Sequence, residues 1–167
     1  MKKILKFVDA ISEWTGKIAS WSSVVIVIIV CGEVIARKFF NHPTIWGFEV
    51  TKQLYTFLFL MVAAFTLLHN AHVGVDVLCV KFSKRTNAIL AVINYILFFF
   101  PFILVLIYEG TKFAADSWAT HETTMDVLAA PLYPIKTVIP VAFLLLLIQG
   151  CVNFIRSLHI ATKGEEL

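Results

Sequence analysis

Few side chains in this sequence could carry out chemistry, and most of them stand beside long apolar runs. Glu33 lies four residues before Arg37, a spacing at which a carboxylate and a guanidinium share one face of a helix and can pair. Such a carboxylate could serve as an ion or proton site, or it could form a structural salt bridge near the end of a helix. Because the next turn already supplies its partner, we favour the salt bridge.

A second polar patch opens the next apolar run and contains Trp46, Glu49, Lys52 and Gln53. Lys52 and Gln53 follow Glu49 by three and four residues, so a helix would place all three on one face. The sequence leaves two interpretations of this patch open. It is either the solvated start of a helix or a contact with a partner subunit.

The histidines and cysteines do not form a convincing cofactor site. His69 and His159 stand near the ends of two runs at matching depth, as bis-histidine haem ligation requires, but both lie at a polar boundary. The three cysteines lack metal-ligand spacing. The sequence also contains no Gly-rich phosphate loop, no Ser/His/Asp set and no pair of carboxylates inside a run. We therefore expect no metal, no cofactor and no enzymatic activity.

The elements that must position these residues are four uncharged apolar runs, bounded by Lys17 and Glu33, Lys52 and His69, Arg85 and Glu109, and Lys136 and Arg156. As a helix, the segment 88–108 would rise roughly 31 Å at about 1.5 Å per residue, which matches the hydrocarbon core of a bilayer. Charges are costly at the bilayer centre, so long charge-free runs are typical of spanning helices. The sequence predicts an all-α integral membrane protein with four transmembrane helices.

Composition supports this class. Hydrophobic residues make up 59% of the chain and charged residues 15%, whereas a soluble domain has about 25% charged residues. The net charge of +3 is small and spread along the chain, so we expect no nucleic-acid partner. The first run lacks a small-residue cleavage site and is followed by charged residues, so we interpret it as a retained span rather than a signal peptide.

We expect a single membrane domain over residues 1–167. The predicted spans are 18–38, 46–69, 87–116 and 131–157, and Pro101 should kink the third or mark a packing contact in it. Two amphipathic segments, 3–17 and 74–85, are too short to cross a bilayer and are predicted to lie in its interface as helices in contact with membrane lipids. For 3–17, the alternative is a cytoplasmic extension of the first span.

The distribution of Lys and Arg predicts the orientation, since cytoplasmic loops carry an excess of both. With both termini cytoplasmic, nine of these residues fall inside and five outside. The inner residues are Lys2, Lys3, Lys6, Lys17, Lys81, Lys84, Arg85, Arg156 and Lys163, and the outer ones are Arg37, Lys38, Lys52, Lys112 and Lys136. We therefore expect a multi-pass protein with cytoplasmic N- and C-termini.

From Arg37 to Asp76 the pattern becomes specific. An Arg closes the first span, Trp46-Gly-Phe-Glu49 opens the second, and His72-Val-Gly-Val-Asp76 follows it. This pattern resembles the small membrane subunit (the Q, or DctQ-like, subunit) of tripartite ATP-independent periplasmic (TRAP) transporters. Gly74 permits a tight turn, and Asp76 would complement the dipole of a following helix.

The resemblance implies a role in the bacterial inner membrane. The small subunit would not bind substrate but would act as a scaffold for a large multi-span subunit, which works with a periplasmic substrate-binding protein. The complex would import an organic acid, such as a dicarboxylate or sialic acid, with a sodium gradient. Two alternatives are a haem- or quinone-linked anchor of a redox complex and an autonomous small exporter. The candidates for partner contacts or structural roles are Glu33, Arg37, Trp46, Glu49, Lys52, His72 and Asp76.

Overall fold

The computed structural model describes residues 2–69, 83–126 and 128–163, without the side chains of residues 2, 4 and 163. Helices dominate this part of the chain, and an isolated bridge joins Thr123 and Pro131 in a loop. The elements are α1 (Lys2–Phe40), α2 (Gly47–Leu68), α4 (Lys84–Asn94), the π-helix η1 (Tyr95–Phe99), α5 (Phe100–Ala119) and α6 (Tyr133–Lys163).

The expectation of four membrane-spanning helices is confirmed by length and composition. Four helical stretches are long and apolar enough to cross a bilayer: Leu5–Phe40, Gly47–Leu68, Lys84–Ala119 and Tyr133–Thr162. The third contains α4, η1 and α5 in succession, and η1 comes directly before Phe100 and Pro101. Proline cannot donate a backbone hydrogen bond, and a π-turn is one way in which a helix accommodates such a residue.

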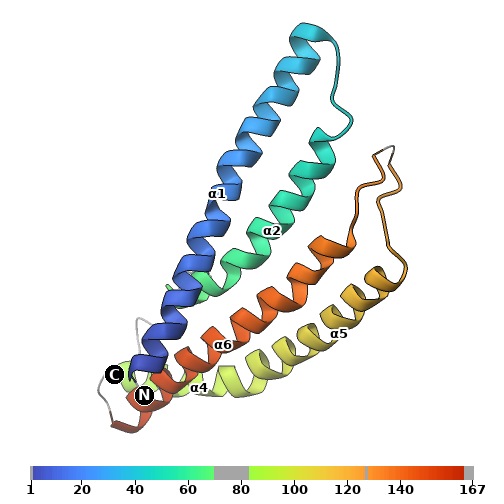
Figure 1. The fold of residues 1–167 in the computed structure, drawn as a ribbon. Coiled ribbons are helices and arrows are strands. Elements are labelled where there is room, and N and C mark those ends of the chain that lie inside the picture. The colour runs from blue at the N-terminus through green and yellow to red at the C-terminus, as the bar shows by residue number, and fades with distance from the viewer. Residues whose placement is uncertain (1, 70–82, 127, 164–167) are drawn as a thin grey trace.

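The helices lie side by side as a layer in the order α1, α2, α6, α5 (Figure 1). α6 packs against α2 on one side and against α4 and α5 on the other, and it also meets α1. The α1–α2 and α5–α6 hairpins converge near the two chain termini and diverge toward their connecting loops (Figure 1). Both termini therefore lie at one end of the layer, which we call the terminal end; the opposite end is the loop end.

The structure does not separate an interfacial helix over 3–17 from the first span, because both belong to α1. Residues of 3–17 belong to the same buried face of α1 as residues of the first span. Leu5, Ser12, Gly16 and Ala19 point inward, while apolar side chains of the predicted membrane face point outward, with Ile18 59% exposed. Small and polar residues allow close packing against other helices, and the large apolar ones are left for lipid.

The second predicted interfacial helix, 74–85, lies mostly outside the described residues. Its last part is described and belongs to the third span. Ser83 is the N-cap of α4, and its hydroxyl accepts a hydrogen bond from the Thr86 amide at 3.2 Å. Capping by serine satisfies an amide that the first helical turn leaves free. Lys84 and Arg85 therefore stand in the first turn of α4.

Small residues bring the helices together. Six of the eight buried apolar side chains are shorter than leucine or isoleucine, and five of these are alanines. A Cβ at Gly16 would overlap the side chain of Phe65 on α2, and a Cβ at Gly150 would overlap the ring of Phe99 on η1. Single glycines thus permit the close approach of α1 to α2 and of α6 to η1, although the sequence has no Gly-x-x-x-Gly motif.

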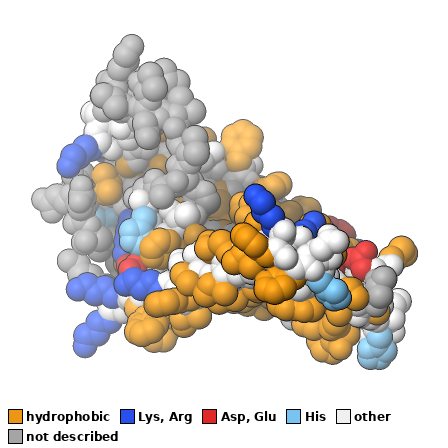
Figure 2. Space-filling view, turned by 90° about the horizontal axis from the view of Figure 1, so that it is seen from above, with side chains coloured by type: hydrophobic (Ala, Val, Ile, Leu, Met, Phe, Trp, Pro, Cys, Tyr) orange, Lys and Arg blue, Asp and Glu red, His pale blue; other side chains and the backbone are white. Residues whose placement is uncertain are grey.

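Large apolar side chains cover much of the surface, as Figure 2 shows for one side of the molecule. Only 6% of the residues in the most apolar window of each of the first three spans are buried. Water would make such exposure costly, whereas hydrocarbon tails or apolar protein surfaces accept it. This layer is therefore suited to a membrane and to contact with other membrane-embedded surfaces.

Candidate functional site: polar contacts at the two ends of the layer

A network of polar side chains joins three helices at the terminal end. We call Asp9, Ser12, Gln149, Asn153 and Arg156 the polar cluster. The Ser12 hydroxyl donates to Gln149 Oε1 at 2.7 Å, and Gln149 Nε2 donates to Asp9 Oδ1 and Asn153 Oδ1, both at 3.2 Å. Arg156 pairs with Asp9. Asn153 Nδ2 donates to the backbone oxygen of Leu67 at 2.9 Å, which adds α2 to the network.

The polar cluster satisfies groups that would be costly to bury alone. Gln149 is fully buried and Ser12 is 1% exposed. An amide without a hydrogen-bond partner in an apolar setting loses several kcal/mol, on the order of 2–7, so each member depends on the others. The hydrogen bonds and the ion pair described above go to other members of the cluster or to the backbone oxygen of Leu67. Its chemistry is that of a structural clamp.

Sequence reasoning did not identify the polar cluster. Its signal was present, since Gln149, Asn153 and Arg156 follow each other by four and three residues and must share a helical face. Asp9 and Ser12 share a face in the same way. Nothing in the sequence pairs one face with the other, because they lie on helices separated by most of the chain.

At the loop end, the predicted pair of Glu33 and Arg37 is present. Arg37 Nε lies 2.8 Å from Glu33 Oε1. The other carboxylate oxygen accepts from the backbone amide of Thr44 at 3.2 Å and from the Thr44 hydroxyl. Glu33 therefore fastens the loop between α1 and α2. Asn41 ends α1 with a positive φ of 49°, and His42 N donates to Ala36 O at 3.2 Å, as in a helix-terminating turn.

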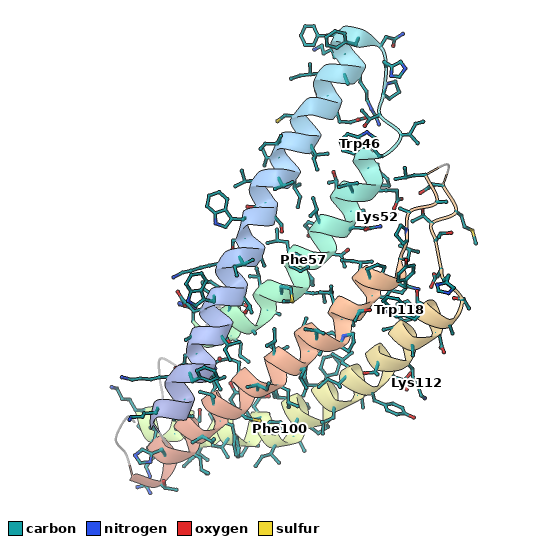
Figure 3. The ribbon with its side chains drawn as sticks, viewed as in Figure 1. Trp46, Lys52, Phe57, Phe100, Lys112 and Trp118 are labelled. Atoms are coloured by element: carbon teal, nitrogen blue, oxygen red, sulfur yellow. The ribbon has the colours of Figure 1, made fainter. Side chains whose placement is uncertain are left out.

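The patch at the start of α2 is only partly solvated. Glu49 is 2% exposed, and its Oε1 accepts from Lys52 Nζ at 2.6 Å. Glu49 Oε2 is buried and has no hydrogen-bond partner within the described part of the chain. Gln53 Nε2 donates to Pro131 O at 3.3 Å. Trp46 precedes α2 and is 48% exposed. Trp46 and Lys52 stand near the loop end of α2 (Figure 3).

The loop between α5 and α6 is held by a second ion pair that sequence reasoning did not predict. Glu122 pairs with Lys136, whose ammonium lies 3.9 Å from the centroid of the Phe113 ring. The hydrogen bond from Lys136 holds the pKa of Glu122 below its ordinary value. Thr124 N donates to Ala130 O and Leu132 N to Glu122 O, each at 2.9 Å. These bonds join the two sides of a hairpin loop, residues 120–126 and 128–132.

The remaining candidates fall into two groups. His72 and Asp76 lie outside the described residues, so the predicted corner has no structural account. His69 stands at the end of α2, with Nε2 3.4 Å from Glu13 Oε2 and Nδ1 3.1 Å from Phe65 O. Within the described ranges, no group of three or more His, Cys, Asp or Glu side chains is placed to hold a metal ion.

These features define a class: a small multi-pass helical membrane protein whose described polar contacts join helices and fasten loops. The comparison with protein families then identifies the family. The model of a family described as "Tripartite ATP-independent periplasmic transporters, DctQ component" matches residues 26–159, which is most of the chain. The chain therefore belongs to the DctQ family and is a small membrane component of a TRAP transporter. A comparison with curated proteins gave no match.

The match also bears on activity and partners. The DctQ family is a family of transporter components and not of enzymes. Membership of this family implies association with the large membrane subunit and a substrate-binding protein. Together with the four apolar helices, it supports a multi-pass membrane location. The matched range contains Glu33, Arg37, Trp46, Glu49 and Lys52 as well as His72 and Asp76.

Proposed function

We propose that this chain is the scaffold subunit of a sodium-driven TRAP transporter that imports an organic acid, such as a dicarboxylate or sialic acid, across the bacterial inner membrane. The large subunit carries out transport, and this chain holds it in the bilayer. The proposal also places both termini in the cytoplasm, in line with the Lys and Arg distribution and with the two termini lying at one end of the layer (Figure 1).

The observation that carries this proposal is the chemistry of the groove between α1 and α2. It has a volume of about 660 Å³ and is bordered by Ser20, Ser23, Phe143 of α6 and a run of α2 side chains. Neither lysine nor arginine lines it. An organic acid would need a cationic or multiple-donor site to compensate for its desolvated carboxylate. This groove does not offer one, which supports placing substrate recognition in another subunit.

Trp46 is the side chain that we assign to the contact with the large subunit. Trp46 and Trp118 are each 48% exposed, but the indole of Trp118 makes its contacts within this chain. Trp118 Nε1 donates to Thr137 Oγ1 at 2.8 Å, and its ring is tilted against that of Tyr133 with the ring centroids 4.4 Å apart. Figure 3 shows the two tryptophans at the loop ends of α2 and α5. Exposed tryptophans are frequent anchors of protein interfaces.

Two measurements test the proposal. In proteoliposomes, uptake of labelled organic acid should require the large subunit, the binding protein and an inward sodium gradient, and this chain alone should give none. Trp46→Ala should lower the affinity for the large subunit by roughly tenfold, as for loss of an interface anchor. Trp118→Ala is the matched control and should lower the Tm of the isolated chain while leaving that affinity unchanged.

The contrary results are equally definite. Sodium-driven uptake by this chain alone would refute the scaffold role. Equal effects of the two tryptophan substitutions on affinity for the large subunit would refute the assignment of Trp46 to the interface but not the scaffold role.

A further inference from the structure

The groove between α1 and α2 covers only half of the membrane thickness. Along α2 its lining runs from Thr66 to Tyr55, a rise of roughly 17 Å at about 1.5 Å per residue. One leaflet contributes about 15 Å, half of the hydrocarbon core. Gly16 of α1 lies against Phe65, so the groove begins near the terminal end and stops close to mid-membrane.

The serine and threonine residues that line the groove do not make it a polar site. Ser20 Oγ donates to Gly16 O at 2.8 Å, Ser23 Oγ to Ser20 O at 2.6 Å and Thr66 Oγ1 to Ala63 O at 2.8 Å. These three hydroxyls are thus satisfied by their own helices and do not need a polar ligand. The rings of Tyr55 and Phe59 stack with their centroids 6.5 Å apart, and both side chains are largely exposed. A hydrocarbon chain could lie against them.

The end of the groove near the termini carries charge. A smaller hollow of about 330 Å³ shares Ser20 with the groove and is lined by Lys17, Trp21 and Val24. The Lys17 ammonium lies 2.8 Å from Glu13, which in turn is 3.4 Å from His69 just after α2 ends. The ammonium is therefore level with the end of a membrane-length helix, where phospholipid headgroups lie.

We propose that this face binds one glycerophospholipid of the leaflet at the terminal end. Its phosphate would contact Lys17, and one acyl chain would lie in the groove between α1 and α2. The Lys17 side chain is 64% exposed, and its ammonium has three N–H donors. It can therefore donate to a phosphate while it remains paired with Glu13. Trp21, 71% exposed, lies one helical turn further along α1 in the same hollow, where its ring offers an apolar surface to the lipid below the phosphate.

Charge and length favour a lipid over a transmembrane helix of a partner. A partner helix would cross the full core of about 30 Å, whereas the groove ends near Tyr55. The cationic group at one end and the apolar lining beyond it match the order of phosphate and acyl chain in a lipid. The proposal does not depend on the scaffold role.

The test uses the full chain purified in detergent and a phosphatidylglycerol with a photoactivatable diazirine midway along one acyl chain. Native mass spectrometry counts bound lipids and gives their affinity, and peptide mapping locates the crosslinks. We expect one preferred lipid, with crosslinks in the peptides that contain Leu58, Phe59 and Ala63. Ala63→Phe should fill the groove and weaken the preferred binding at least tenfold. Lys17→Gln should weaken it several-fold.

Two control variants carry the same chemical changes on α5. Val105→Phe adds similar bulk at an exposed position of α5, and Lys112→Gln removes an exposed lysine that pairs with Glu109 at 3.7 Å. Both should bind the lipid as the wild type does. Phe59→Ala removes an exposed ring from the groove lining and should also weaken binding, so the test does not rest on Ala63→Phe folding well.

Three results would overturn the proposal. The first is equal binding by wild type, Ala63→Phe and Phe59→Ala. The second is crosslinks spread evenly over all helices, which would indicate unselective lipid contact. The third is loss of the groove crosslinks in the purified complex together with new crosslinks from the groove to the large subunit, which would assign the groove to a protein partner.

Discussion

At the scale of single residues, Gln149 is the buried side chain whose hydrogen bonds connect the other members of the polar cluster. It is fully buried, its oxygen accepts from Ser12, and its nitrogen donates to Asp9 and Asn153. Few groups in an apolar layer could replace it, because each of its partners also needs a hydrogen bond. The neighbouring pair of Arg156 and Asp9 is more exposed and has access to the polar side of the interface.

We predict that Gln149→Leu destabilises the isolated chain by about 1–3 kcal/mol, since it leaves buried polar partners unsatisfied. The Tm in detergent should fall by several degrees. The control is Gln53→Leu, which removes only a 3.3 Å hydrogen bond to Pro131 O at a half-buried position. An equal fall in both variants would contradict the special role of the cluster.

Also at this scale, Glu122 should make the hairpin loop sensitive to acid. Its pKa is lowered in the folded chain by Lys136. The stabilisation is therefore fully present above the unfolded value of about 4.3 and is lost as the pH falls through the folded pKa. We expect the backbone amides of residues 120–126 and 128–132 to lose hydrogen-exchange protection, relative to the amides of α5, as the pH is lowered from 7 to below 4.

Lys136→Met should remove most of this acid dependence, because it takes away the cation that holds the pKa down. Lys112→Met is the control, since Lys112 pairs with Glu109 at 3.7 Å and both side chains are exposed. Unchanged acid dependence in Lys136→Met would show that another group governs the loop.

At the scale of helices, two glycines set how closely neighbours pack. Gly16 faces Phe65 across the α1–α2 contact, whereas Gly32 on the same helix has open space around it. The two positions therefore separate close packing from helix propensity. Close packing at Gly16 requires the absence of a Cβ, whereas Gly32 has room for one.

We predict that Gly16→Ala destabilises the α1–α2 contact, with a cost of about 1–3 kcal/mol from forced overlap. Gly32→Ala should be neutral or stabilising by up to about 1 kcal/mol, because alanine is the better helix former. Thermal unfolding of both variants in the same detergent gives the comparison. A Gly16→Ala variant as stable as Gly32→Ala would mean that the two helices can move apart without loss.

At the scale of the whole molecule, the layer has two different ends. The terminal end holds the polar cluster and the chain termini, and the loop end holds Glu33, Glu49 and Glu122 with their cationic partners. The apolar surface between them is wide and little buried. A chain of this shape has ample surface for a partner and for lipid, and the two proposed contacts do not compete for the same residues.

The proposed orientation can be tested with single cysteines in a background free of Cys31, Cys79 and Cys151. Cysteines at Lys6 and Lys84 should react with a membrane-impermeant thiol reagent only from the cytoplasmic side. A cysteine at Met125, which is fully exposed in the hairpin loop, should react only from the periplasmic side. Labelling in the reverse pattern would invert the topology.

The sequence by itself determined the class of protein, because hydrocarbon imposes a rule that can be checked locally. A spanning helix must be long and free of charge, and four such runs are visible in the residues alone. The pair of Glu33 and Arg37 was predictable for the same reason, since both residues lie on one helix at a fixed spacing. The short patterns around Arg37, Trp46 and Glu49 indicated the family that the comparison confirmed.

Only the tertiary structure decided which helix faces meet. The segment 3–17 has an amphipathic pattern that suits an interfacial helix, yet within α1 it runs on into the first span, and its residues Asp9 and Ser12 have their partners on α6. Gln149 stands 137 residues from Ser12 in the chain, and helical spacing carries no information over such a distance. Packing across the layer, and not local pattern, therefore created both the polar cluster and the groove.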